Sequence, residues 1–213
     1  MDSDRVRPRL VLASASPARR RSLRAAGIDA DVVLSGVDES SVHASGPEVL
    51  SGMLARLKAQ AVAERLRRDL RGERVLVLGC DSVLAFDGEV LGKPGSPAEA
   101  VARWQRMRGK QGVLHTGHAL VEVGTGRLAE AVATTRVQFA EVSDEEIAAY
   151  VATGEPLAVA GGFTIDGIGG PFVARIEGDP GTVIGLSLPL LRRLLAELGV
   201  PLTALWHARH TVT

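Results

Sequence analysis

The stretch LVLASASPARRR, residues 10–21, passes within a few positions from an apolar run to two serines, a proline and three arginines. Residues 10–13 are typical of a short buried strand. Ser16 followed by Pro17 supplies the favoured N-cap and first position of a helix, and Gly27 is a suitable C-terminal stop. The stretch therefore predicts a strand that leads directly into a helix, which is the repeating unit of α/β folds.

The remainder of the chain alternates strands with helices and then turns to hairpins. We expect further strands at 28–34, 75–78, 83–86, 89–91, 113–123, 128–140, 163–165 and 172–176, and helices at 47–68, after 96, after 143 and at 186–198. The helix at 47–68 presents an apolar face formed by Val49, Leu50, Met53, Leu54, Leu57 and Ala61. No repeat or linker divides the chain, so we predict an α/β fold, a mixed twisted sheet with flanking helices, in a single domain over 1–213 with its core at about 9–200.

Composition excludes several classes of function. Lys and Arg together number 25, as do Asp and Glu, and aromatic residues make up 3% of the chain. A neutral chain with few aromatic residues has neither the basic groove nor the stacking surface of a nucleic-acid-binding protein. No apolar run approaches the length of about 20 residues that a membrane span requires. The single cysteine fits a reducing compartment, so we expect a cytoplasmic protein without a nucleic-acid or membrane partner.

The start of the predicted helix after Ser16 is a candidate anion site. Helix N-termini carry unpaired N–H groups and a partial positive charge, and arginine suits phosphate oxygens. Ser14 and Ser16 add hydroxyl groups there. Arg19, Arg20 and Arg21 step around the helix axis and cannot all face one ligand. This stretch is compatible with phosphate binding and equally with an ordinary capped helix whose outer face is rich in arginine.

Two carboxylates and two lysines are further candidates. Asp81 follows the predicted strand 75–78, where side chains of α/β sheets commonly reach a ligand crevice, although a turn aspartate fits as well. Together with Glu39 it would give the hard oxygen donors that Mg²⁺ prefers. Lys58 fits a solvated helix face. Lys93 lies in EVLGKPGS, which has no second glycine at the spacing of a P-loop and has proline in place of the Ser/Thr that would meet the metal. Cys80 is interpreted as a buried strand residue, with a thiol nucleophile as the alternative.

The order of these motifs along the chain is more specific than any one of them. LASASPxRR, VDE, ARLKA, GCDSV, LGKP, HTG, AGGFTIDGIG and GTVIGLSLP follow one another between about Leu10 and Leu198. In this arrangement the sequence resembles the Maf family of nucleoside triphosphate pyrophosphatases. The resemblance implies a fold like that of inosine triphosphate pyrophosphatases, with two lobes around a central cleft, and frequently a homodimer.

The resemblance also implies an activity and roles for individual residues. The activity is hydrolysis of a nucleoside triphosphate to the monophosphate and diphosphate with Mg²⁺ or Mn²⁺, which would cleanse the nucleotide pool. Ser14, Ser16 and Arg19 match the family's phosphate loop, and Asp81 matches its proton acceptor. The remaining catalytic matches are Glu39, Lys58 and Lys93. From the residues alone, Asp81 could act as general base or, with Glu39, as a metal ligand.

Three positions depart from the family branch that prefers dTTP and UTP. Ala18 replaces the first arginine of SPRR, Ser82 replaces the threonine after the aspartate, and Asp166 stands in FTIDG where that branch has glutamine. In the family these positions influence the choice of base, so the preference for dTTP and UTP is not carried over to this chain. Two other functions are compatible with the motifs, namely a nucleotide-binding regulator of cell division or septum formation with slow or incidental hydrolysis, and a nucleotidyl transferase.

Overall fold

A computed structural model describes residues 7–70 and 72–207 of the chain, so both ends of the predicted domain, 1–6 and 208–213, lie outside the described residues. Its strands form one seven-stranded sheet. The strands are β1 (Arg9–Leu12), β2 (Ala30–Val32), β3 (Val75–Phe86), β4 (Glu89–Leu91), β5 (Gln111–Glu122), β6 (Leu128–Phe139) and β7 (Val173–Glu177). Their order is β2-β1-β3-β5-β6-β7, with β4 paired to β3.

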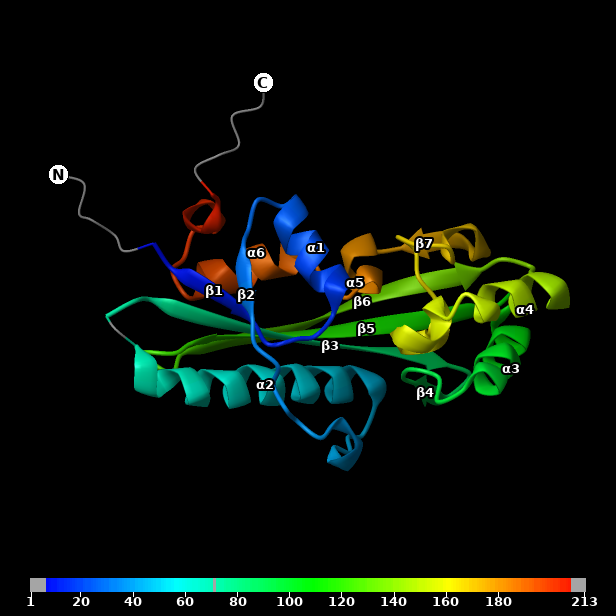
Figure 1. Ribbon diagram of the computed structural model, residues 1–213, viewed down its shortest axis with the longest axis horizontal. Coiled ribbons are helices and arrows are strands. Elements are labelled where there is room, and N and C mark those ends of the chain that lie inside the picture. The colour runs from blue at the N-terminus through cyan, green and yellow to red at the C-terminus, as the bar shows by residue number, and fades with distance from the viewer. Residues whose placement is uncertain (1–6, 71, 208–213) are drawn as a thin grey trace, which may run out of the picture.

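The sheet is mixed. β1 runs parallel to β2 and to β3, whereas every other pair of neighbouring strands is antiparallel. The α-helices are α1 (Pro17–Ala25), α2 (Pro47–Leu66), α3 (Pro97–Met107), α4 (Asp144–Ala152), α5 (Pro180–Ile184) and α6 (Leu188–Glu197). Figure 1 shows α2 on one face of the sheet and α1, α5 and α6 on the other. The predicted α/β class with a mixed sheet and flanking helices is confirmed.

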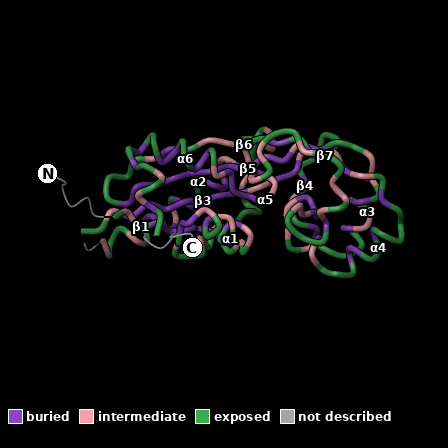
Figure 2. The backbone as a smooth tube through the Cα atoms, turned by 90° about the horizontal axis from the view of Figure 1, so that it is seen from above, coloured by how far each residue is buried: buried purple, intermediate pink, exposed green. Residues whose placement is uncertain are grey.

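Two lobes are connected by the long strands β3, β5 and β6 (Figure 2). One lobe contains β1, α1, α2 and α6, and it buries apolar side chains on both faces of the sheet. The other lobe contains β4, β7, α3 and α4 around an aromatic cluster, in which Trp104 lies edge-on to Phe139, Tyr150 and Phe172. Within residues 7–70 and 72–207, no helix is long and apolar enough to cross a bilayer.

Three sequence-based predictions of secondary structure were wrong. The segments 75–78 and 83–86 belong to one strand, β3, because the residues between them also pair with β5. The segment 163–165 is not a strand: Phe163 packs edge-on against Phe139, and the chain then enters a loop. The segment 28–34 contains only the three-residue strand β2.

The buried face of α2 also differs from the predicted one. Val49, Met53 and Leu57 are exposed. The residues of α2 that are buried are Ser51, Leu54, Ala55, Lys58, Ala59, Val62 and Ala63. The predicted face followed the largest apolar side chains. The actual face is made mostly of small ones because α2 lies unusually close to the sheet.

Glycines in β3 and β5 permit this close approach. A Cβ atom on Gly79 would lie 2.1 Å from the carbonyl oxygen of Ala55, and one on Gly117 would lie 2.1 Å from that of Ser51. Both distances are far below van der Waals contact, and the obstructing atoms belong to the backbone of α2. The two glycines therefore fix how deeply α2 seats on the sheet, and with it the position of Lys58.

We expect Gly117→Ala to lower the free energy of unfolding by about 2–4 kcal/mol, because the added methyl group must push α2 away from the sheet. Urea denaturation of purified variants measures this change. Gly46→Ala is the matched control, since a Cβ at Gly46 meets no atom within 4 Å. Equal stabilities of the two variants would show that α2 does not require this contact.

Candidate active site

The edge of β3 is open where the two lobes join. β1 pairs with β3 as far as Leu78, and β4 pairs with it from Leu84 onward. Within the described residues, no strand pairs with this edge of β3 between those two points. The polar residues Asp81 and Ser82 lie in the gap, and because they are adjacent in a strand, their side chains point to opposite faces. The prediction that Asp81 follows the end of a strand was therefore wrong, although it does border an opening in the sheet.

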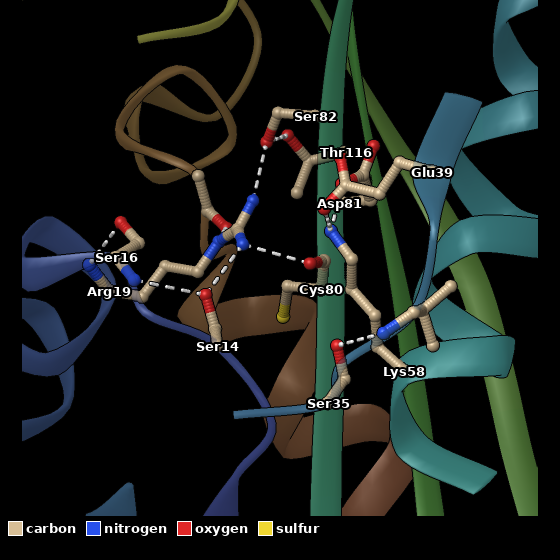
Figure 3. Close-up of polar contacts among 12 residues, drawn as sticks. Ser14, Ser16, Arg19, Ser35, Glu39, Lys58, Cys80, Asp81, Ser82 and Thr116 are labelled. Atoms are coloured by element: carbon tan, nitrogen blue, oxygen red, sulfur yellow. Dashed lines mark hydrogen bonds and ion pairs between the residues drawn. The ribbon is translucent and has the colours of Figure 1, made fainter. Parts of the chain in front are cut away.

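On the α2 face, one lysine holds two carboxylates. The ammonium nitrogen of Lys58 lies 2.5 Å from Oδ1 of Asp81 and 2.6 Å from Oε1 of Glu39. Asp81 and Lys58 are each 7% exposed, whereas the side chain of Glu39 is 56% exposed. Figure 3 shows the three side chains converging from β3, α2 and the short helix at Glu39–Ser41. Lys58 is thus a buried group facing the sheet, and its interpretation as a solvated helix residue was wrong.

Burial and charge act in opposite directions on Asp81. Burial raises its pKa above the ordinary value, and the Lys58 ammonium opposes this by favouring the carboxylate. The net result is a raised pKa. A basic carboxylate beside a buried ammonium is suited to proton transfer or to cation binding, which are the two roles that the sequence left open.

On the opposite face, Arg19 donates hydrogen bonds to four protein acceptors. Its Nε donates to the carbonyl of Gly185 at 2.8 Å, and its Nη1 donates to Ser14 Oγ at 2.9 Å and to the carbonyl of Cys80 at 2.8 Å. Its Nη2 donates to Ser82 Oγ at 3.1 Å. A guanidinium has five N–H groups, so one remains for a ligand. Arg19 mainly joins the loop at Ser14 to β3 and to the end of α5.

Ser82 continues this network across the sheet. Its hydroxyl accepts from Arg19 and lies 2.9 Å from Thr116 Oγ1. Because Thr116 gives its one hydroxyl hydrogen to the carbonyl of Thr182 at 2.8 Å, Ser82 is the donor in its contact with Thr116. Thr116 and Thr182 are fully buried. Sequence reasoning did not identify Thr116 as a site residue, because its partners come from β3 and α5, far away in the chain. Its place in the HTG motif was the available signal.

Ser14 and Ser16 shape the loop between β1 and α1. Ser14 Oγ accepts the N–H of Ser16 at 3.2 Å, and Ser16 caps α1 by accepting the N–H of Arg19 at 3.4 Å. Each hydroxyl oxygen accepts in these contacts and keeps its own hydrogen for another acceptor. The predicted N-cap at Ser16 is confirmed, and the loop adjoins the start of α1.

The other predicted residues lie around this centre. Lys93 is exposed, and no hydrogen bond or ion pair within the described part of the chain joins it to Asp81 or Arg19. Ala18 is half-buried on α1. Asp166 lies in the other lobe and pairs with Arg21 at 3.2 Å. Cys80 is fully buried, and burial raises the pKa of its thiol to about 11, which confirms its interpretation as a strand residue.

Fold and site together define a two-lobed α/β protein in which basic and acidic side chains gather at an open edge of the sheet. The chain matches the family described as Maf-like protein over residues 9–198, and it belongs to that family. It is 69% identical to a protein of Salinispora tropica over 93% of this chain and 87% of that protein. It is 54% identical to one of Streptomyces avermitilis over 97% and 98%, respectively, and 57% identical to one of Synechococcus elongatus over 93% and 98%. Each of these relatives bears the name nucleoside triphosphate pyrophosphatase.

We expect Arg19→Ala to lower the free energy of unfolding by about 3–5 kcal/mol, because four acceptors, most of them buried, lose their donor at once. Arg19→Lys should recover only part of this loss, since an ammonium cannot reproduce the geometry of a guanidinium fork. Chemical denaturation measures both variants, with Arg20→Ala on the exposed side of α1 as the control. A free energy of unfolding for Arg19→Ala equal to that of the control would show that the four hydrogen bonds of Arg19 do not stabilise the fold.

We expect the buried His118 to make the free energy of unfolding depend on pH. Its Nε2 accepts the N–H of Ser187 at 2.9 Å, its Nδ1 contacts the carbonyl of Thr116 at 3.0 Å, and burial lowers its pKa to about 4. Below pH 6.5 this histidine is protonated in the unfolded chain but stays neutral in the folded chain. Its contribution to the free energy of unfolding therefore falls between pH 6.5 and 4, by on the order of 3 kcal/mol in total.

The variant His118→Gln should therefore lose less stability than the wild type between pH 7.5 and 4. Guanidinium denaturation at several pH values measures the difference, with His43→Gln, at an exposed position, as the control. Parallel curves for His118→Gln and the wild type would assign the acid sensitivity to other groups.

Proposed function

We propose that this protein hydrolyses nucleoside triphosphates between the α and β phosphorus atoms, giving a nucleoside monophosphate and diphosphate. The observation that carries the proposal is the buried Lys58 ammonium between Asp81 and Glu39, on the other face of β3 from the network of Arg19 and Ser14. Family membership and the names of the relatives support the same reaction.

The phosphate chain would bind along the open edge of β3. A triphosphate carries about four negative charges, and the departing diphosphate gains charge as the bond breaks. The N-terminus of α1 and the hydroxyl groups of Ser14 and Ser16 supply donors, and Arg19 adds its remaining N–H. Lys58 and the exposed Lys93 supply positive charge for the leaving group.

Asp81 would act on the attacking water. In this step the water oxygen forms a bond to the α phosphorus, the bond from that phosphorus to the bridging oxygen breaks, and the water proton passes to Asp81. The diphosphate leaves with the bonding electron pair. Burial raises the pKa of Asp81, which makes its carboxylate a better proton acceptor, while Lys58 holds the side chain in place.

The donor set also fits a divalent cation. Mg²⁺ and Mn²⁺ prefer carboxylate oxygens, and Mg²⁺ typically takes one or two carboxylates together with substrate phosphates. Asp81 and Glu39 converge on one point, now held by the Lys58 ammonium, and would supply these two carboxylates. When bound, the cation would neutralise phosphate charge and lower the pKa of a bound water.

We further propose that the enzyme cleanses the free nucleotide pool of the cytoplasm as a homodimer. A single cysteine, fully buried, suits that reducing compartment. The preference of the dTTP- and UTP-specific branch is not extended to this enzyme, because Ala18, Ser82 and Asp166 depart from the residues of that branch. Ser82 is bonded to Arg19 and Thr116, so any effect of this residue on the base would pass through that network.

A panel of common and modified nucleoside triphosphates, assayed with and without Mg²⁺ or Mn²⁺ and with separate detection of diphosphate and phosphate, tests the reaction. We expect metal-dependent diphosphate together with a monophosphate. Release of phosphate alone would contradict the proposed bond. Tight triphosphate binding with negligible turnover would favour a regulator, and products heavier than the monophosphate would favour a nucleotidyl transferase.

We expect Asp81→Asn to reduce kcat by roughly 10³-fold, because asparagine keeps the shape of the side chain but accepts no proton. The thermal melting temperature of the variant shows that it is folded. Asp29→Asn is the control, since Asp29 is an exposed partner of Arg24 and His207. Retention of most of the wild-type rate by Asp81→Asn would remove Asp81 from catalysis.

A further inference from the structure

Two buried histidines of β5 lie on opposite faces of the sheet, and their hydrogen bonding differs. His118 uses both ring nitrogens, one with the N–H of Ser187 and one with the carbonyl of Thr116. His115 is 9% exposed, and its Nδ1 lies 3.0 Å from Thr134 Oγ1. Its Nε2 has no hydrogen-bond partner within the described chain and is not one of the fully enclosed atoms there. The fold therefore satisfies His118 completely, whereas His115 keeps one nitrogen for a ligand.

His115 lies on the same face of the sheet as Asp81. Gly117 is the direct partner of Asp81 in the pairing of β3 with β5, and His115 is two positions away on β5, opposite Val83. Side chains two positions apart on a strand share a face, so Asp81 and His115 are diagonal neighbours, roughly 7 Å apart at their Cβ atoms. Gly117 has no side chain to separate them. The open nitrogen of His115 therefore belongs to the surface that adjoins the Asp81 carboxylate.

Thr134 fixes the orientation of the imidazole ring. It is the direct partner of His115 on β6, so the two side chains meet on one face. Burial lowers the pKa of His115, and the carboxylate of Glu48 opposes this shift without reversing it. A neutral imidazole has one N–H and one acceptor nitrogen. When Thr134 donates its hydroxyl hydrogen to Nδ1, the N–H is on Nε2, and His115 presents a donor suited to a phosphate oxygen.

The two lysines assigned to the leaving group lie on either side of His115 along β3. Lys58 contacts Asp81, at the middle of the open edge. β4 runs antiparallel to β3 and pairs Leu91 with Leu84, so the chain leaves β4 at the boundary of the open edge, two residues before Lys93. His115, opposite Val83, is level with the interval between these two points. A group that extends from Lys58 toward Lys93 on this face would pass His115.

We propose that His115 is a binding residue for the departing diphosphate, and that its Nε2–H donates to an oxygen of that group while Lys58 and Lys93 supply positive charge. This inference rests on the proposed function for the identity of the ligand. An N–H aimed at an anionic oxygen adds a directional hydrogen bond to the charge of the lysines. A change at His115 should therefore affect diphosphate and leave the nucleoside monophosphate unaffected.

Two substitutions separate the roles of the two ring nitrogens. In His115→Asn the amide can replace Nδ1 but does not reach the position of Nε2, whereas in His115→Gln the longer side chain can place its NH₂ group there. Calorimetry in the presence of Mg²⁺ measures the binding of inorganic diphosphate and, separately, of the common nucleoside monophosphates. His207→Asn is the matched control, since His207 is an exposed partner of Asp29.

We expect His115→Asn to weaken diphosphate binding by about tenfold and monophosphate binding by less than about twofold, because one hydrogen bond to a charged oxygen is lost. His115→Gln should recover most of the diphosphate affinity. In turnover, inhibition by added diphosphate should weaken by the same factor in His115→Asn. Unchanged diphosphate affinity in the folded variant would overturn the inference, as would equal weakening of both ligands. A glutamine variant as weak as the asparagine variant would overturn the assignment to Nε2.

Thr134→Val provides a second arm, which also serves if the variants of His115 do not fold. It removes the hydroxyl group that orients the ring, so diphosphate binding should weaken by a smaller factor in the same direction, and unchanged binding would contradict the orientation that the inference requires. Wild-type protein that binds diphosphate but releases none from triphosphates would refute the proposed reaction and leave this comparison intact. Turnover with unaltered diphosphate affinity across the variants would refute only the role of His115.

Discussion

The arrangement of the site depends on one buried ion pair, that of Lys58 with Asp81. Removing two charges from water costs several kcal/mol for each ion, and this cost is offset only when the groups meet at hydrogen-bond distance. That requires α2 to lie against β3, and Gly79 and Gly117 make the required space. A sheet with ordinary side chains at these two positions would hold Lys58 too far from Asp81. The small residues between α2 and the sheet therefore allow the buried ion pair of Lys58 with Asp81 to form.

The second constraint is the short length of β1. Because β1 ends at Leu12, the chain turns away and leaves the edge of β3 open, so that consecutive residues of one strand serve two chemically different regions. Asp81 joins the acidic and basic cluster under α2, and Ser82 joins the network of Arg19. A ligand at this edge would lie between them. Two faces of a sheet, which are normally separated by the strands themselves, become neighbours only at such a gap.

The parts of the fold that depend on local pattern could be predicted from the sequence. The capped helix after Ser16, the long pair formed by β5 and β6, and the mixed α/β class all follow from residues close together in the chain. The continuity of β3 could not, because Gly79 and Asp81 look like the end of a strand until α2 supplies the contacts that both require. The burial of Lys58 has the same origin, since propensity and periodicity place a lysine in solvent.

The candidate site shows the same division between local and distant information. The structure brings into contact Asp81, Lys58 and Glu39, three residues that the motif order had singled out, whereas the sequence described Arg19 only as a phosphate ligand. Four of its five N–H groups are occupied by protein acceptors, three of which, on Cys80, Ser82 and Gly185, come from segments distant in the chain. A guanidinium so engaged acts chiefly through the shape it imposes on its neighbours. An arginine in a phosphate motif therefore indicates where an anion is bound, whereas the number of its N–H groups already in use determines whether it binds that anion itself.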